Sequence, residues 1–464
     1  MNTPRLFLAS VALFATVALS AQITVDPASV VGPIKPMHGV NNGPKEVGDD
    51  QSRGNFDDYA AACIPFARTH DAAFQADYGG EHSVDITGIF PDFSKDPYDP
   101  ASYDFPMTDK YLKTIREAGT EVFYRLGQKI EHGVKKYGIL PPADFKKWAV
   151  ICEHIIRHYN QGWANGFNWN IRYWEIWNEP DLDSRNEAWK VNPRTWGGSP
   201  EQFFDLYTIT AKHLKSCFPE LKIGGPAIAG DEEWADRFLA HMQKNKVPMD
   251  FFSWHIYDVN PTAVSSKADR MRVLMDKYGY KDAESILNEW NYVKGWSTDY
   301  PYSVDAMNSI KGACFTAAVM QDCQDKPVDI LMYYDARVGT IFNTLFNFYD
   351  FSPTSCYYPF YAWSKLVKYG QQVKVSGNSD PELHVTAAKD SKGRLGILVT
   401  RYTDDNNVVT AKKVKVNVMG MKINEAIGHR TDKHHLFTEV PVKVKDGTIE
   451  FNLDPTSFIY LSVE

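Results

Sequence analysis

The chain of 464 residues lacks several features that would set it apart from ordinary globular proteins. After its N-terminal segment it has no run of 18 or more apolar residues, so we expect no membrane span in the processed protein. It has no basic tract, and its formal net charge is −8, which argues against a nucleic acid as partner. It also lacks a low-complexity linker. Because 44% of its residues are hydrophobic, the chain can bury a large core.

Cysteines are few and widely spaced, and no CxxC or His-rich metal-binding spacing occurs. We therefore expect mostly buried thiols and at most one disulfide. The nearest pair, Cys314 and Cys323, falls nine residues apart on one predicted helix, where the two thiols cannot readily meet. The six positions are Cys63, Cys152, Cys217, Cys314, Cys323 and Cys356.

Residues 1–21 have the pattern of a secretory signal peptide. Arg5 supplies the positive charge, residues 6–19 are mostly apolar, and the small residues Ser20 and Ala21 precede Gln22. An uncleaved anchor is the alternative, but the apolar stretch is short for a membrane span. No cysteine follows the expected cleavage point, which argues against a lipoprotein. We expect an exported protein, periplasmic or extracellular.

Residues 36–369 alternate short apolar runs with longer amphipathic stretches. Eight strands that alternate with helices predict an α/β fold, a closed (β/α)₈ TIM barrel. A doubly wound open sheet is the rival, but it would call for a Gly-rich phosphate-binding turn, which we do not find. The predicted strands are 37–41, 65–70, 121–126, 173–178, 222–225, 251–255, 285–289 and 330–335.

From residue 370 to 464 the pattern changes to short strands separated by turn signals such as Gly-Asn and Asp-Gly. This predicts a C-terminal β-sandwich domain. We expect the segment 22–35 to supply an N-terminal strand that joins this domain. Because no linker separates the two parts, we expect them to pack together.

The sharpest motif is Tyr-Trp-Glu-Ile-Trp-Asn-Glu-Pro-Asp-Leu at 173–182. On the barrel reading, Glu179 emerges at the C-terminal rim of strand four, where barrel enzymes assemble their catalytic groups. Pro180 ends the strand there because it cannot donate to a sheet ladder. We expect the neighbouring Trp177 and Asn178 to give Glu179 an apolar wall and a polar neighbour, a setting that raises the pKa of a carboxyl group.

A second motif, Ser-Ile-Leu-Asn-Glu-Trp-Asn at 285–291, ends strand seven in Glu289. Strands four and seven of eight lie nearly opposite each other, so the two carboxyls can face across the mouth. A separation of about 5–5.5 Å would make one a nucleophile and the other an acid/base, with retention of configuration, and about 6.5–9.5 Å would imply inversion. A single Glu at a strand end is more often a salt-bridge partner, but two in matching contexts favour catalysis. We expect a structural role for Glu175.

With these motifs the sequence resembles clan A of the glycoside hydrolases, most closely family 39, which contains β-xylosidases and α-L-iduronidases. The resemblance covers roughly residues 36–368, and such enzymes also carry a terminal β-sandwich. Asn288 stands where family members often have Thr. The matching segments are Arg-Thr-His-Asp at 68–71, Glu-Ile-Trp-Asn-Glu-Pro at 175–180, His-Ile-Tyr at 255–257 and Asn-Glu-Trp-Asn at 288–291.

The resemblance implies that Glu179 is the acid/base and Glu289 the nucleophile. It also implies that Asn178 hydrogen-bonds the sugar hydroxyl next to the reacting carbon. His255 and Tyr257 alternate on strand six and would face the mouth, where Tyr257 would donate to Glu289 and keep its pKa low. The alternative for both is a buried aromatic ring whose polar end is satisfied within the core.

Three further pairs are candidate substrate or site residues. Arg68 and His70 share one side of strand two, where an Arg would hold the nucleophile ionised, or would form an ordinary ion pair in the barrel wall. Asp335 and Arg337 at the rim of strand eight would bind sugar hydroxyls or an anionic substituent, or would pair with neighbouring charges. Trp290 and Trp296 would stack on sugar rings, or would serve as plain packing.

The expected function is an exported, retaining glycoside hydrolase that releases a terminal sugar, similar to a xylosidase, galactosidase or arabinosidase. An endo-acting polysaccharide hydrolase and a non-catalytic carbohydrate-binding barrel are the alternatives. The expected partner is a carbohydrate. No metal or other cofactor is implied, because two carboxyls suffice for the chemistry. The sequence gives no sign of an oligomeric state.

Overall fold

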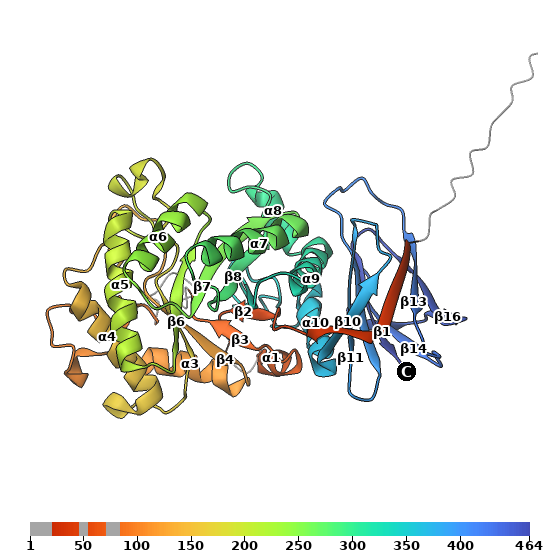
Figure 1. Ribbon diagram of the computed structural model, residues 1–464, viewed down its shortest axis with the longest axis horizontal. Helices are drawn as coiled ribbons and strands as arrows, with labels where there is room; N and C mark the ends of the chain where they lie inside the picture. The colour runs from red at the N-terminus through yellow and green to blue at the C-terminus, as the bar shows by residue number, and fades with distance from the viewer. Residues whose placement is uncertain (1–20, 46–53, 71–83) are drawn as a thin grey trace, which may run out of the picture.

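The computed structural model describes residues 21–45, 54–70 and 84–464 (Figure 1). Residues 1–20 of the predicted signal peptide and Asp71 of the Arg-Thr-His-Asp segment lie outside the described residues. The described chain forms a barrel and a separate β-sheet domain beside it.

Eight parallel strands close into a barrel in the order in which they occur in the chain. This confirms the predicted (β/α)₈ fold and excludes the open doubly wound sheet. Each of the eight predicted segments overlaps one barrel strand, and β6, β7 and β8 extend beyond the predicted segments. The strands are β2 (Gly39–Asn41), β3 (Phe66–Arg68), β4 (Glu121–Leu126), β5 (Tyr173–Ile176), β6 (Lys222–Ile228), β7 (Phe251–Asp258), β8 (Glu284–Tyr292) and β9 (Ile330–Tyr333).

The helices cover the outside of the barrel. Their ends follow ordinary capping rules: the Asp144 carboxylate caps α4 by accepting from two backbone N–H groups, and Ser199 forms a capping box with Gln202 at α5. The helices are α1 (Phe56–Ala61), α2 (Ile86–Ile89), α3 (Pro106–Glu117), α4 (Phe145–Gln161), α5 (Pro200–Cys217), α6 (Glu232–Lys244), α7 (Pro261–Lys277), α8 (Tyr300–Met307), α9 (Ile310–Gln324) and α10 (Tyr358–Tyr369). Short 3₁₀ turns are η1 (Pro100–Ser102), η2 (Trp163–Asn165), η3 (Arg185–Lys190) and η4 (Ser355–Tyr357).

Inward-facing apolar side chains fill one end of the barrel interior and leave polar groups at the other. This apolar layer lies near the N-terminal ends of most strands, because side chains alternate in and out along each strand. The carboxyl ends of the strands are therefore left to carry polar side chains. The layer consists of Phe66, Phe123, Tyr173, Phe251, Ile286, Ile330 and Met332.

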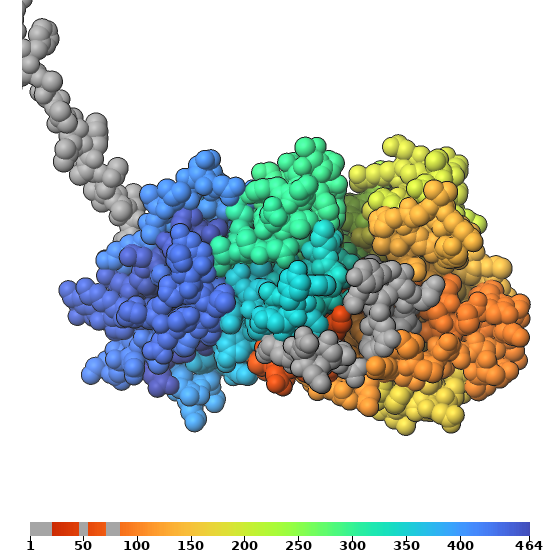
Figure 2. Space-filling view, turned by 180° about the vertical axis from the view of Figure 1, so that it is seen from behind, coloured from red at the N-terminus to blue at the C-terminus, as the bar shows by residue number. Residues whose placement is uncertain are grey.

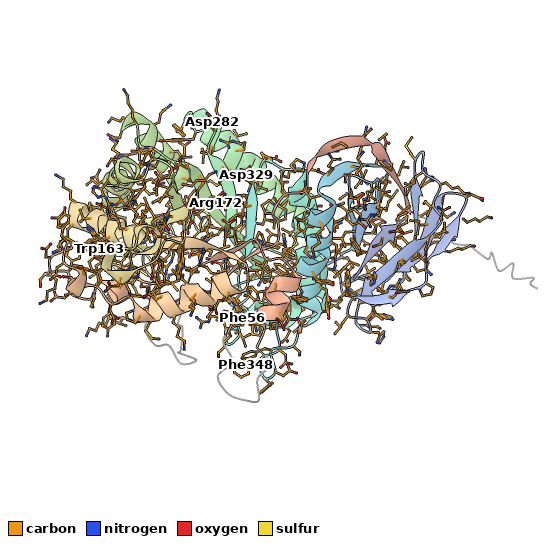
Figure 3. The ribbon with its side chains drawn as sticks, turned by 90° about the horizontal axis from the view of Figure 1, so that it is seen from below. Phe56, Trp163, Arg172, Asp282, Asp329 and Phe348 are labelled. Atoms are coloured by element: carbon orange, nitrogen blue, oxygen red, sulfur yellow. The ribbon has the colours of Figure 1, made fainter. Side chains whose placement is uncertain are left out.

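The two ends of the barrel can be told apart in Figure 3. Arg172, Asp282 and Asp329, which come shortly before β5, β8 and β9, lie toward one side of the barrel. Phe56 and Phe348, in segments that follow β2 and β9, lie on the opposite side. The mouth formed by the C-terminal ends of the strands therefore opens toward Phe56 and Phe348.

The C-terminal domain confirms the prediction of a second, all-β body. Its strands form one continuous ten-stranded sheet, in the order β15-β14-β18-β12-β11-β10-β1-β13-β17-β16, that curls around its own apolar core. Ala426–Thr431 was not predicted as a strand, because its Gly, His and Arg hide the alternation. The strands are β1 (Ala21–Pro33), β10 (Gln371–Ser376), β11 (Leu383–Lys389), β12 (Leu395–Arg401), β13 (Lys412–Val418), β14 (Ala426–Thr431), β15 (Thr438–Val440), β16 (Lys443–Lys445), β17 (Thr448–Leu453) and β18 (Ser457–Val463).

The sheet domain packs directly on the barrel, as the space-filling view in Figure 2 also shows. Leu398 and Tyr460 of the sheet belong to the same apolar cluster as helices α9 and α10. Polar contacts reinforce this boundary: the Gln321 side chain donates to the Leu398 carbonyl, and Asp322 lies 2.6 Å from His384. The strand β1 lies between β10 and β13, so the N-terminal segment is an integral part of the sheet.

All six cysteines lie in the described residues and are free thiols, four of them buried. Burial raises the pKa of the Cys152 and Cys314 thiols well above the usual value, so these side chains behave as small apolar core residues. Among the helices that the structure describes, none has the length and apolarity to span a membrane.

Candidate active site

Glu179 leaves β5 through an irregular turn. Trp177 and Glu179 both have positive φ, 75° and 49°, a backbone conformation that is uncommon outside functional sites. Three hydrogen bonds hold the turn: the Trp177 N–H donates to Leu126, the Glu179 N–H donates to Ala227, and the Thr195 hydroxyl donates to the Glu179 carbonyl at 2.6 Å. The backbone that carries the Glu179 carboxyl is therefore held by both neighbouring strands, β4 and β6, and by the loop that follows.

The indole of Trp177 does not form the apolar wall that we expected beside Glu179. It is fully buried on the outside of the barrel, with ring centroids 5.8 Å from Trp148 and 5.1 Å from Trp196. The turn after Ile176 reverses the alternation expected of a strand, so that Trp177 faces the helices while Asn178 faces the interior. This expectation was wrong because it assumed a regular strand up to Asn178.

Glu289 owes its orientation to a bulge in β8. Trp254 of β7 pairs with Leu287, but the next residue, His255, pairs with Glu289, so Asn288 is an extra residue in the ladder. The side chains of Asn288 and Glu289 therefore both reach interior groups, Glu175 and Tyr257 respectively. In a regular strand, adjacent residues would face opposite sides.

The structure brings Glu179, Glu289 and His255 together at the mouth. One side-chain oxygen of each carboxyl and one imidazole nitrogen all lie within 4.8 Å of one another. His255 Nδ1 is 2.8 Å from Glu179 Oε1 and 3.6 Å from Glu289 Oε2. The nearest oxygens of the two carboxyls are thus no more than 4.8 Å apart across the mouth.

Three other predicted residues surround Glu289. The Tyr257 hydroxyl donates to Glu289 Oε1 at 2.6 Å, and the Arg68 guanidinium donates to Oε2 at 3.3 Å. His70 Nε2 lies 3.4 Å from the same Oε2. The hydrogen bonds from Tyr257 and Arg68 stabilise the ionised form of the carboxyl.

Arg68 also connects the site to a buried polar layer beneath it. Its Nε donates to Glu175 at 2.6 Å, and another nitrogen donates to the side-chain oxygen of Asn178 at 2.6 Å. Glu175 is fully buried and additionally accepts from Ser253. The structural role predicted for Glu175 is confirmed: it balances Arg68, which in turn orients Asn178.

Burial dominates the electrostatics of the site. It raises the pKa of Glu289 to about 7; the Glu179 carboxylate acts in the same direction, while His255, Arg68 and Tyr257 oppose it. The expected hydrogen bond from Tyr257 exists and lowers the pKa of Glu289, but burial outweighs it. The expectation that this pKa stays low was therefore wrong. Burial also lowers the pKa of His255 to about 4, so this imidazole is neutral at pH 7.

Asp335 lies at the end of β9 as predicted, but its carboxylate is engaged within the protein. It is 1% exposed and accepts from the Arg337 backbone N–H, the Asn42 amide and the Thr340 hydroxyl. Burial raises its pKa to about 6. These contacts come from neutral donors and tie the loop after β9 to the end of β2. Arg337 is half-buried beside it.

The two tryptophans predicted as sugar contacts lie in different surroundings. Trp290 is fully buried, with its ring 5.2 Å from Tyr333 and 6.3 Å from Phe315 of α9, so its prediction as a substrate contact was wrong. Because Trp290 directly follows Glu289 in β8, its side chain faces the outside of the barrel while that of Glu289 faces the interior. Trp296 is 60% exposed and meets the Tyr257 ring edge-on at 4.9 Å. Trp296 therefore borders the mouth.

Sequence reasoning missed two groups that support the site. Asn41 at the end of β2 accepts from Arg68 and donates to the Asn288 carbonyl, which fixes the bulge. The buried Lys267 of α7 donates to the His255 carbonyl at 2.8 Å. Asn41 carried a usable signal, a polar residue that ends a short apolar strand, whereas Lys267 carried none.

Glu179, His255 and Glu289 are also spaced like the ligands of a metal ion. The Arg68 guanidinium, 3.3 Å from Glu289, already supplies positive charge at this point and disfavours a second cation. A second group with ligand-like spacing, between α4 and α5, consists of Glu153, His213 and Cys217.

Comparison with known proteins decides the family. The profile of Glycosyl hydrolases family 39 matches residues 67–343, more than half of the chain. The chain belongs to this family. The family 39 match contains both carboxyl motifs, and so confirms the resemblance that the sequence suggested.

Curated relatives of this family 39 chain include two β-xylosidases. One, from Geobacillus stearothermophilus, is 28% identical over 234 residues, or 47% of this chain and 42% of the relative. The other, from Caldicellulosiruptor saccharolyticus, is 31% identical over 166 residues, or 34% of this chain and 31% of the relative. The matched segments thus span less than half of either relative.

Solved structures resemble the whole fold. A glucosidase from Croceicoccus marinus has a TM-score of 0.77 at 22% identity, covering 97% of this chain and 99% of that one. A monomeric β-xylosidase from Caulobacter crescentus CB15 has a TM-score of 0.68 at 16% identity, covering 96% and 99%. At these identities the likeness shows the fold, the barrel together with its sheet domain.

Proposed function

We propose that this protein is a retaining glycoside hydrolase in which Glu179 is the acid/base and Glu289 the nucleophile. The observation that carries the proposal is the cluster of Glu179, Glu289 and His255, whose facing atoms lie within 4.8 Å of one another at the mouth of the barrel. Two carboxyls at this range suit double displacement through a glycosyl-enzyme.

The surroundings assign the two roles. Glu289 receives hydrogen bonds from the Arg68 cation and from the Tyr257 hydroxyl, whereas Glu179 faces His255, which is neutral at pH 7. The donors around Glu289 stabilise its negative charge, which suits the role of nucleophile. Glu179 faces the neutral His255 instead, which suits the role of acid/base.

In the first step Glu289 attacks the anomeric carbon while Glu179 gives its proton to the leaving-group oxygen. The glycosidic C–O bond breaks, and a covalent glycosyl-enzyme forms with inverted configuration. In the second step Glu179, now ionised, takes a proton from water, and this water displaces Glu289. The second inversion restores the original configuration.

Asn178 and His70 complete the pocket in this proposal. Arg68 holds the Asn178 side-chain oxygen, which leaves its amide N–H groups to donate toward a sugar hydroxyl next to the reacting carbon. His70 stands 3.4 Å from Glu289 and 5.6 Å from the Tyr334 ring, on the side of the pocket formed by β3 and β9. The neutral His255 fixes the Glu179 side chain between the two steps.

For the substrate we propose a terminal sugar of the xylose type. Two curated β-xylosidases and a β-xylosidase structure support this choice, and the glucosidase among the structural neighbours makes a glucoside the alternative. Galactosides and arabinosides belong in the same screen. A panel of aryl glycosides would rank these sugars directly.

The decisive experiment for the mechanism is proton NMR of the first-formed product, recorded within minutes of mixing and before mutarotation. Retention requires that a β-glycoside yields the β-anomer first. Initial release of the opposite anomer would mean that Glu289 activates water, and would overturn the double-displacement proposal.

A further inference from the structure

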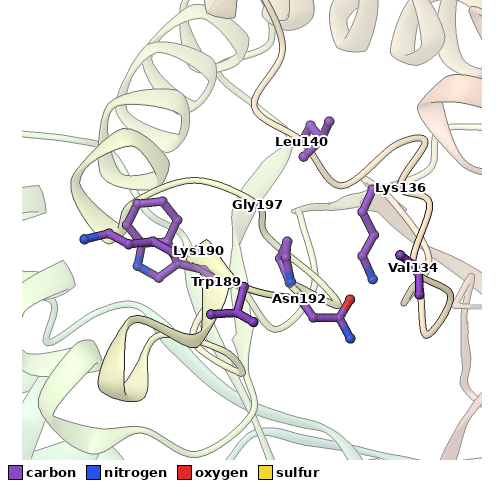
Figure 4. Close-up of a pocket in the computed structure, with 9 residues that line it drawn as sticks. Val134, Lys136, Leu140, Trp189, Lys190, Asn192 and Gly197 are labelled. Carbon is purple, nitrogen blue, oxygen red and sulfur yellow. The ribbon is translucent and has the colours of Figure 1, made fainter.

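A groove lies between the loop that follows β4 and the loop that follows β5, the strand that leads to Glu179. It has a volume of about 620 Å³, within the range of roughly 300–1,000 Å³ that ligand sites occupy. In Figure 4, Val134 and Lys136 form one side, Trp189 and Lys190 form the other, and Asn192 lies between them. Both loops start at C-terminal ends of barrel strands, and therefore at the mouth.

Hydrogen bonds connect this groove to Glu179. The Thr195 hydroxyl donates to the Glu179 carbonyl at 2.6 Å, and the Trp177 indole donates to the Thr195 carbonyl at 2.8 Å. The loop that carries Trp189 is thus the direct continuation of the acid/base turn. In the proposed mechanism Glu179 protonates the leaving group, so sugars on its side of the scissile bond leave toward this loop.

The groove is held in shape before any ligand binds. The Asp183 carboxylate accepts from the Arg194 backbone N–H and from its guanidinium, and the Asp183 carbonyl accepts from the Trp189 N–H. The two loops are joined by hydrogen bonds from Glu131 N–H to the Arg194 carbonyl and from Gly197 N–H to the Ile139 carbonyl. A wall fixed in this way loses little entropy when a ligand binds.

The lining combines apolar surface with positive charge. The half-buried Trp189 offers an aromatic face of the kind that packs on a sugar ring, and Val134 and Val191 are 94% and 88% exposed. All lining residues lie in the described part of the chain, and they include two lysines and no carboxylate. In a protein of net charge −8, this is a local reversal of sign.

The two lysines differ in how far their charge is balanced. The Lys190 ammonium pairs with Glu187 at 2.6 Å, but both side chains are at least half exposed, so water screens this pair. The Lys136 ammonium donates to the backbone carbonyl of Glu131, which uses one of its three donors and carries no full negative charge. Lys136 therefore presents a positive charge to the groove.

We propose that this groove binds the sugar units on the leaving-group side of the scissile bond, and that it takes a chain bearing a carboxylate there. The inference rests on the proposed function, because it uses Glu179 to define the leaving-group side. Trp189 stacks on a sugar ring, and Lys136 pairs with the carboxylate of an acidic sugar. The catalytic pocket holds the terminal sugar, and the groove holds the remainder of the chain.

The test is calorimetric binding to the inactive Glu289→Gln variant, with two probes matched in size that differ in charge. One probe is a xylo-oligosaccharide with a glucuronate branch on its leaving-group units, and the other is the same branched chain with that carboxylate converted to its neutral methyl ester. We expect the acidic chain to bind about fivefold more tightly, because a partly buried ion pair adds on the order of 1 kcal/mol. This preference should fall as the salt concentration rises. Adding Lys136→Ala should abolish the preference.

Two further variants make the result specific. Lys135→Ala, which removes the neighbouring exposed lysine outside the groove lining, should keep the preference for the acidic chain. Trp189→Ala should weaken both probes by several-fold because both lose the stacking face. Equal binding of the two probes, or an equal effect of the Lys135 and Lys136 variants, would overturn the proposal.

Hydrolysis assays with the wild-type protein separate this inference from the proposed function. If the acidic chain binds with Lys136-dependent preference but no aryl glycoside is cleaved, the proposed function fails and the groove remains a carbohydrate site. If aryl glycosides are cleaved and neither chain binds better than a monosaccharide, the groove proposal fails and the catalytic assignment stands.

Discussion

The Tyr257 hydroxyl donates to Glu289 Oε1 at 2.6 Å, from the strand next to the one that carries the carboxyl. Burial raises the pKa of Tyr257 well above its usual value, so the phenol keeps its proton and remains a donor across the working pH range. This contact opposes the effect of burial, which raises the pKa of Glu289 to about 7. The pKa of Glu289, the proposed nucleophile, is thus held near neutrality by opposing effects.

Replacing Tyr257 by Phe should move the acidic limb of the pH–rate profile upward. The variant loses a hydrogen bond that stabilises the carboxylate, so the pKa of Glu289 rises, by about one pH unit if the bond contributes about 1.4 kcal/mol. Glu289 must be ionised to attack, and the variant should therefore lose most activity below pH 7. The profile of kcat/KM against pH measures the shift. An unchanged acidic limb would show that the hydroxyl does not act on the nucleophile.

Replacing Glu179 by Ala should slow cleavage in proportion to how poor the leaving group is. An activated aryl glycoside needs little protonation, whereas an unactivated alkyl or sugar leaving group needs a proton from Glu179, so its rate should fall by about 10²–10⁴-fold more. Glu289→Ala is the matched comparison: it should abolish cleavage of both substrate types, and azide should partly restore it by entering the vacant position. Similar losses for all leaving groups in the Glu179 variant would contradict its role.

Replacing Glu289 by Gln should stabilise the fold increasingly as pH rises. Its pKa in the folded protein, about 7, exceeds the ordinary value of 4.5, so the folded state keeps the proton more strongly than the unfolded state does. The stability associated with this proton is present below about pH 4.5 and is lost as pH rises to 7. The neutral Gln avoids this loss, so the variant should gain about 1–3 kcal/mol over wild type between pH 5 and pH 8.

Urea denaturation of both proteins at the two pH values measures this gain. Glu117→Gln, an exposed substitution on α3, serves as the control and should show no such pH-dependent gain. If the stability difference between Glu289→Gln and wild type were the same at pH 5 and pH 8, the raised pKa would be wrong.

Export is the remaining prediction from the sequence. If residues 1–21 are a signal peptide, the protein recovered from the periplasm or the medium should begin near Gln22 when its N-terminus is sequenced. Deleting these residues should leave the product in the cytoplasm. Recovery in the membrane fraction with the N-terminal residues intact would favour an uncleaved anchor.

Much of the architecture was accessible from the sequence, because its signals are local. Each barrel strand is a short apolar run, and the helices between them have one apolar face, so β/α alternation predicts a closed barrel. The carboxyl ends of parallel strands share one rim, which is why Glu179 and Glu289 could be assigned to the same mouth. Arg68, His255 and Tyr257 followed from the two-residue period of their strands and from the family resemblance.

The sequence could not show which side chains face the mouth, because their orientation depends on departures from regular strand geometry and on contacts with distant parts of the chain. The extra residue at Asn288 exists only because β7 and β8 pair with a bulge, and it decides that Glu289 faces inward and Trp290 outward. The backbone turn with positive φ at Trp177 and Glu179 likewise decides which side chains face the mouth.

The sequence by itself therefore determined the fold class, the family and the residues of the proposed catalytic centre, because strand length, alternation and motif spacing are properties of neighbours in the chain. Only the tertiary structure decided how these residues act. The pKa of Glu289 follows from burial by surrounding strands, and the groove exists because two loops meet. Asp335 accepts a hydrogen bond from Asn42, which is 293 residues away in the sequence but follows the neighbouring strand β2. Burial and contacts between distant segments arise only when the chain has closed on itself.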